Sequence, residues 1–180
     1  MNKGVDSENS DFKLFDIPLN RESYLNTIVN SLSSLLESVI GLEEASGFIS
    51  TVGQKIGDEI NSYYRKAVGG KLSKKQVIQA LIDFKQRIQS DFFIVEETDN
   101  LVVFGCKNCP YNNKASKSKS LCMMTSSIFG IIVAENLGYA KIELKETMAD
   151  NCSECRIVIY FDISIDSTIS KGREFFKSGK

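Results

Sequence analysis

Cysteine is the residue type in this sequence whose number and spacing could support chemistry. The chain has five cysteines and no histidine. Four of them form two Cys-x-x-Cys pairs, Cys106/Cys109 and Cys152/Cys155, and Cys122 lies between the pairs. Because no imidazole is present, a metal ion would be bound mainly by thiolates. Thiolate sites of this kind hold zinc or an iron–sulfur cluster, or act as redox switches.

The spacing of the cysteines leaves several interpretations open. Cys106, Cys109, Cys152 and Cys155 could form a closed, structural zinc site if the fold brings the two pairs together. An iron–sulfur cluster would fit Cys109, Cys122 and Cys155, because Cys122 lies in the first turn of a predicted helix, where the helix dipole favours an anion. The cysteines could instead be small buried apolar side chains. A thioredoxin-type reaction is disfavoured, because neither pair begins a helix.

Length and composition are typical of one soluble domain. The 180 residues are 42% hydrophobic and 25% charged, with a formal net charge of -1, so we expect no general attraction to nucleic acid or anionic lipid. The first residues, MNKGVDSENSDF, lack the apolar core of a signal peptide. The longest uncharged stretch, Ser120–Ala134, is shorter than the roughly 20 residues that span a bilayer. We therefore predict a cytoplasmic protein without membrane contact, where thiols stay reduced.

Hydrophobic periodicity predicts a first helix from Asn20 or Ser23 to about Ile40. Its main apolar stripe repeats at alternating intervals of three and four residues and consists of Leu25, Ile28, Leu32, Leu35 and Val39. This spacing fits a seam between helices, so we predict a homodimer contact along it. Core packing within one subunit would explain the same spacing.

Glycines mark the second predicted helix, which runs from Glu43 to about Val68. Gly47, Gly53 and Gly57 interrupt it, although glycine destabilises a helix interior by about 1 kcal/mol relative to alanine. Such glycines indicate the close approach of another backbone or of a ligand. An apolar pocket without metal is a further possibility, and its predicted lining consists of Phe48, Val52, Met123, Met124 and Phe129.

The rest of the chain predicts two more helices and four strands. A helix from Lys74 to about Gln89 carries Lys74, Lys75, Lys85 and Arg87, which we expect on a solvated basic face. An uncharged, buried helix is predicted over 120–137. The predicted strands are 92–97 and 101–105, which form a hairpin, 139–148 and 155–163.

These elements define an α+β fold of about four helices on a four-stranded, mainly antiparallel sheet. We predict a single domain over residues 20–165, with a flexible N-terminal tail (1–19) and a C-terminal tail (166–180). Ser/His/Asp catalysis is excluded by the missing histidine, and no nucleotide-binding glycine motif follows a strand. We therefore expect a protein that is not an enzyme.

Several segments of the chain resemble a known family. They are GLEEASGFIS at 41–50, GQKIGDEI at 53–60, LCMMTSSIFG at 121–130, AENLGYAK at 134–141 and CRIVIY at 155–160. They are similar to the methanogen output domain family, over about residues 20–176. The family's Cys-Pro pair, Leu-Cys pair and last cysteine correspond here to Cys109-Pro110, Leu121-Cys122 and Cys155, whereas Cys106 and Cys152 are departures from its pattern.

The resemblance implies signal transduction or transcriptional regulation rather than catalysis. By analogy it also implies a sensory fold of the vinyl-reductase or heme-NO-binding type. The leading hypothesis is a sensory domain in which Cys109, Cys122 and Cys155 hold an iron–sulfur cluster or act as a redox or gas sensor, with a protein partner reading the change. The alternatives are a regulatory module with a metal-free apolar pocket and a structural zinc protein used for assembly.

Overall fold

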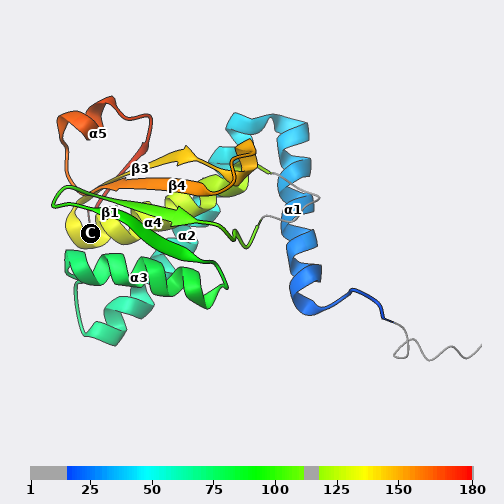
Figure 1. Ribbon diagram of the computed structural model, residues 1–180, viewed down its shortest axis with the longest axis horizontal. Coiled ribbons are helices and arrows are strands. Elements are labelled where there is room, and N and C mark those ends of the chain that lie inside the picture. Colours follow the sequence, from blue (N-terminus) through cyan, green and yellow to red (C-terminus); the bar gives the residue numbers. More distant parts are fainter. Residues whose placement is uncertain (1–15, 112–117, 180) are drawn as a thin grey trace, which may run out of the picture.

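The computed structural model describes residues 16–111 and 118–179 and has an α+β fold with one five-stranded antiparallel sheet. The predicted fold class is confirmed, with one strand more than expected. Residues 1–15 of the predicted N-terminal tail lie outside the described residues. Figure 1 shows helix α1 standing at one end of the molecule, away from the sheet and on the opposite side from α5.

Helices α1 to α3 begin and end close to the predicted residues. α1 spans Arg21–Ile40, and its N-cap Asn20 exchanges hydrogen bonds with Ser23 in a capping box. α2 spans Leu42–Val68 and ends at Gly69 in the left-handed conformation. α3 spans Lys74–Arg87, and Ser73 and Gln76 form its capping box.

Helix α4 (Ser120–Leu137) is the central helix of the fold, packed between the sheet and α2. Gly53 and Gly57 of α2 permit this close packing, because a Cβ at Gly53 would lie 2.8 Å from the Met124 carbonyl oxygen. The predicted close approach is thus confirmed at these two glycines, whereas Gly47 faces open space. α4 is long and apolar enough to cross a membrane, but 72% of it is buried within the described residues, as expected of a core helix.

The sheet has the strand order β1-β2-β4-β3-β5, and all neighbouring strands are antiparallel. The strands are β1 (Phe92–Glu97), β2 (Leu101–Cys106), β3 (Tyr139–Glu146), β4 (Cys155–Tyr160) and β5 (Arg173–Phe176). The predicted hairpin is confirmed as β1 and β2. The register of β2 and β4 pairs Cys106 with Cys155, at the end of the sheet where the site forms.

The predicted C-terminal tail is wrong as a description of residues 166–180. This segment contains most of helix α5 (Ile165–Ile169) and all of strand β5, which pairs with β3. Phe175 is buried against Gly130 of α4, and the ring of Phe176 packs on Tyr139. The segment is polar in composition, so its order depends on a distant strand and on two aromatic side chains.

Candidate functional site: a cysteine-lined cavity

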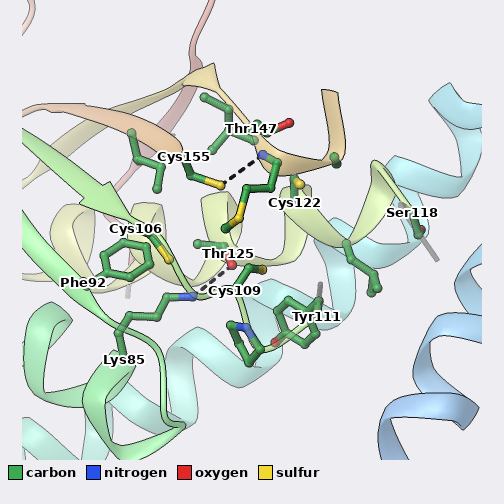
Figure 2. Close-up of a pocket in the computed structure, with 16 residues that line it drawn as sticks. Lys85, Phe92, Cys106, Cys109, Tyr111, Ser118, Cys122, Thr125, Thr147 and Cys155 are labelled. Atoms are coloured by element: carbon green, nitrogen blue, oxygen red, sulfur yellow. Dashed lines mark hydrogen bonds between the residues drawn. The ribbon is translucent and has the colours of Figure 1, made fainter. Parts of the chain in front are cut away.

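Four of the five cysteines line one cavity between α4, the end of the sheet and the loop that follows β2. The cavity has a volume of about 50 Å³. Figure 2 shows Cys106, Cys109, Cys122 and Cys155 around this space, together with Lys85 and Tyr111. The remaining lining residues are Phe92, Pro110, Ser118, Leu121, Thr125, Leu144, Thr147, Met148, Ala149 and Ile157.

The predicted group of Cys109, Cys122 and Cys155 is therefore gathered at one cavity, and Cys106 joins it. Cys152 does not line the cavity. It follows the short 3₁₀ helix η2 (Met148–Asp150), where its backbone N–H donates to the Thr147 carbonyl oxygen. The two Cys-x-x-Cys pairs are thus not both part of the cavity wall, because Cys152 lies in the turn after η2.

The loop from Cys106 to Cys109 is held in place by the residues that precede β1. The Asp91 carboxylate accepts hydrogen bonds from the backbone N–H groups of Lys107 and Asn108. The Ser90 hydroxyl lies 3.4 Å from Cys106 Sγ and donates to the Asn108 carbonyl oxygen. Backbone N–H bonds to a carboxylate are strong, charge-assisted contacts. This cysteine loop is therefore preorganised by hydrogen bonds.

Burial keeps at least three of the thiols protonated at neutral pH. It raises the pKa of Cys106 and that of Cys122 to about 12, and it also raises the pKa of Cys155. A neutral thiol is a poor nucleophile and becomes a thiolate only when a cation compensates its charge. The place of Cys122 in the first turn of α4 therefore does not by itself make it a thiolate, because burial and then the nearby Cys109 raise its pKa.

Lys85 provides a buried positive charge beside the thiols. Its side chain is only 2% exposed, so the prediction of a solvated basic face is wrong for this residue. Its Nζ donates to Thr125 Oγ1 at 3.1 Å and lies 5.0 Å from the ring centroid of Phe92 and 5.2 Å from that of Phe129. No ion pair joins Lys85 to a carboxylate among the described residues.

The pKa of Lys85 is lowered to about 8, because burial removes the ammonium group from water; nearby cysteines, Cys109 first, oppose this shift. Sequence reasoning missed the role of this lysine, although a signal was present. Lys85 follows Ile78 by seven residues and Leu81 by four, so it falls on the inward stripe of α3. A charged residue at such a position indicates either a buried partner or a ligand.

The thiols share the cavity but are not arranged around a single point. Across residues 16–111 and 118–179, no three Cys, Asp or Glu side chains lie close enough to hold a metal ion as they stand. Among these residues no two cysteines form a disulfide. Binding of an ion would thus require the cysteine side chains, or the loop and helix that carry them, to move towards one another.

A polar cluster connects the cavity to α1 and was not anticipated from the sequence. Ser118, which lines the cavity, and Ser120, the first residue of α4, both contact the Ser33 hydroxyl, at 2.6 and 2.7 Å. The Glu37 carboxylate accepts from the Ser118 hydroxyl and from the Ser120 backbone N–H at 2.8 Å. The pKa of Glu37 is lowered because, although burial opposes it, these hydrogen bonds stabilise the ionised carboxylate.

None of the residues predicted to line an apolar pocket contributes to the cysteine-lined cavity. Phe48 and Val52 are 64% and 47% exposed on α2, so this part of the prediction is wrong. Met124 and Phe129 are buried in the core, and Met123 borders a different surface depression. The reason is the orientation of α2, whose glycine side faces α4, so that Phe48 and Val52 point outward.

The predicted dimer stripe also lies on the surface. Leu25, Ile28, Leu32, Leu35 and Val39 are all exposed, and the last three reach 63%, 60% and 70%. Packing against the described residues of the same subunit therefore does not explain their spacing.

The fold is that of a small α+β domain, and its sequence family makes it a regulatory or output domain. Sequence comparison assigns it to a family, because the profile of methanogen output domain 1 matches residues 28–160. The chain belongs to the methanogen output domain 1 family, as the sequence resemblance implied. No curated protein matches this chain.

Among solved structures, the fold is similar to that of a trafficking protein particle complex subunit 3 from Naegleria fowleri, which is covalently bound to palmitic acid. The TM-score is 0.61 with 12% sequence identity, over 87% of this chain and 98% of that chain. At this identity the likeness concerns the fold alone.

Proposed function

We propose that this domain is a non-catalytic regulatory module that responds to a thiolate-bound metal centre, zinc or an iron–sulfur cluster, in the cysteine-lined cavity. The observation that carries the proposal is the buried ammonium group of Lys85 beside four thiols, without a carboxylate partner in the described part of the chain. The proposed ligands are Cys106, Cys109, Cys122 and Cys155, from β2, the following loop, α4 and β4.

Charge balance favours this ligand. A buried cation is unfavourable unless an anion lies close to it. With Cys106, Cys122 and Cys155 protonated, these thiols offer Lys85 no negative charge, whereas metal binding would convert them to thiolates. Several thiolates around a divalent ion leave an excess of negative charge, which the ammonium group of Lys85 would offset. The cavity of about 50 Å³ also suits a compact ligand better than a long chain.

The movement that such binding needs supplies a regulatory response. Drawing Cys122 towards Cys109 would shift the first turn of α4, and Ser120 in that turn is bonded to Glu37 of α1. A ligand that favours one of two arrangements shifts the population between them. We propose that a protein partner in a cytoplasmic signalling pathway reads the resulting change in α1.

The experiment is metal analysis of protein purified without oxygen. The expected result is stoichiometric zinc without colour, or a brown protein with iron and acid-labile sulfide. Cys109→Ser and Cys122→Ser variants should each lose at least about tenfold in metal affinity. Cys152→Ser is the matched control and should keep its metal, because Cys152 does not line the cavity. Metal-free protein that stays metal-free and colourless after anaerobic reconstitution would exclude the metal centre.

A second candidate ligand is a small apolar molecule or acyl group. The support is the largely apolar cavity wall and the palmitic acid bound covalently to the Naegleria protein of similar fold. A 16-carbon chain would require the cavity to open well beyond its present volume. Mass spectrometry of the intact protein tests this candidate, because a thioester adds the mass of the acyl group and is removed by neutral hydroxylamine.

A further inference from the structure

Helix α1 buries mainly polar side chains, with the partly buried Val29, against the protein, and it presents an apolar stripe to solvent. The inward side carries Asn30 and Ser33, which are buried, and Glu37, which contacts the start of α4. Leu32 and Leu35 lie on the opposite side and are largely exposed. Among the described residues, Figure 1 shows no other labelled helix or strand on the side of α1 that faces away from the sheet. An amphipathic helix in a globular protein normally has the opposite orientation.

We propose that the outer stripe of α1, defined as Leu25, Ile28, Leu32, Leu35 and Val39, pairs with the same stripe of a second copy of this chain, with the two helices antiparallel. The alternation of three and four residues is the spacing of positions a and d in a coiled coil, whose side chains interlock with an identical stripe. An exposed, continuous apolar stripe of this kind marks an interaction surface. This inference is independent of the ligand proposed above.

Charges at the two ends of α1 support the antiparallel direction. Arg21 is the first residue of α1, and Glu43 and Glu44 follow its last residue by only a short turn. With Leu32 and Leu35 near the twofold axis, Arg21 of one copy lies towards Glu43 and Glu44 of the partner subunit. A parallel pair would instead place like charges together at both ends. Opposite charges at the flanks of a helical pair favour the arrangement that brings them together.

The same charges argue against binding of the α1 stripe to a membrane surface. Helices that lie on anionic membranes carry lysine and arginine beside their apolar face. α1 has one basic residue, Arg21, and its flanks carry Glu22, Glu43 and Glu44. An anionic bilayer would repel this combination, whereas a second copy satisfies it.

Sedimentation equilibrium of the full chain at micromolar concentration tests the pairing. Wild-type protein should have twice the mass of one chain, and a Leu32→Glu/Leu35→Glu variant should have half the wild-type mass with an unchanged circular dichroism spectrum. Ile165→Glu is the matched control, because Ile165 is 82% exposed on α5, and this variant should remain a dimer. A monomeric wild type, or a double variant that still dimerises, would overturn the proposal.

Charge reversal tests the direction of the helices. Arg21→Glu should weaken dimerisation at least several-fold, and adding Glu43→Lys and Glu44→Lys to it should restore the wild-type affinity. Failure of this restoration would overturn the antiparallel arrangement. In a separate arm, flotation of the wild type with vesicles of phosphatidylcholine and phosphatidylglycerol should leave it unbound. Binding that the Leu32→Glu/Leu35→Glu variant loses would identify the stripe as a membrane contact and overturn the second-copy proposal.

Discussion

Helices α1 and α3 have equally regular apolar stripes but present them to opposite environments. In α3 the stripe is buried and includes Lys85, whereas in α1 the stripe is exposed and the buried side is polar. α3 therefore holds a buried charge with no ion-pair partner among the described residues, and α1 has an exposed apolar face. The difference teaches that periodicity identifies a stripe without deciding what the stripe contacts. For both helices we expect the missing contact from outside the single chain: an anionic ligand beside Lys85 and a second copy of the chain at the stripe of α1.

Truncation of one leucine in each stripe tests this comparison and should give the largest difference in the free energy of unfolding. Leu81 of α3 is fully buried, so Leu81→Ala should lower the free energy of unfolding by about 2–5 kcal/mol. Leu32→Ala should change the stability of the monomer by no more than about 0.5 kcal/mol, since Leu32 is largely exposed. Urea unfolding at a protein concentration low enough to dissociate a dimer measures both. Equal losses would show that the two stripes are not in different environments.

A smaller effect is expected from removing the buried charge of α3. In metal-free protein Lys85→Met should raise the free energy of unfolding by about 1–3 kcal/mol, because a desolvated ammonium group is replaced by an apolar side chain of similar length. Lys75→Met on the same helix is the control, and its effect should stay within about 0.5 kcal/mol because Lys75 is exposed. A large loss of stability for Lys85→Met would mean that Thr125 and the aromatic rings around Lys85 already compensate the burial of its charge.

The smallest effect concerns the polar side of α1 and depends on pH. Glu37→Gln should lower the free energy of unfolding by about 1 kcal/mol at neutral pH, because two hydrogen bonds lose their charged acceptor. The folded-state pKa of Glu37 lies below its usual 4.5, so this stabilisation is present above that pH and is lost as the pH falls through the folded-state value.

Unfolding of the wild type and of Glu37→Gln at a series of pH values measures this dependence. The two stability curves should converge in acid, and Glu22→Gln, at the exposed start of α1, should show only a few tenths of a kcal/mol at any pH. Curves that stay parallel down to low pH would mean that the ionised Glu37 does not fasten α1 to α4.

Much of the fold could be predicted because its signals are local. The start of α4 follows from an uncharged run that begins at Ser120, its end follows from Gly138, and the hairpin follows from the turn at Thr98–Asn100. Strand β5 could not be predicted, because four residues with two charges carry little apolar pattern. Its order comes from pairing with β3 and from the contact of Phe175 with α4.

The candidate site was predicted only in part, because some of its features depend on contacts between residues far apart in the chain. Cys109, Cys122 and Cys155 were expected to meet, and all three line one cavity, but the exclusion of Cys152 depends on the turn after η2. Lys85 was assigned to solvent because a lysine on a helix surface normally is solvated. Its burial depends on Phe92 and Phe129, which the sheet and α4 bring over it from distant positions in the chain.

The amino-acid sequence by itself determined helices α1 to α4, most strands, the membership of the methanogen output domain 1 family and the supply of thiols without imidazole, because caps, glycines, periodicity and composition act over a few residues. Only the tertiary structure decided which cysteines share a cavity, that Lys85 is buried beside them and that the stripe of α1 faces outward. These features depend on strand register and on helix orientation, which result from contacts between residues far apart in the chain.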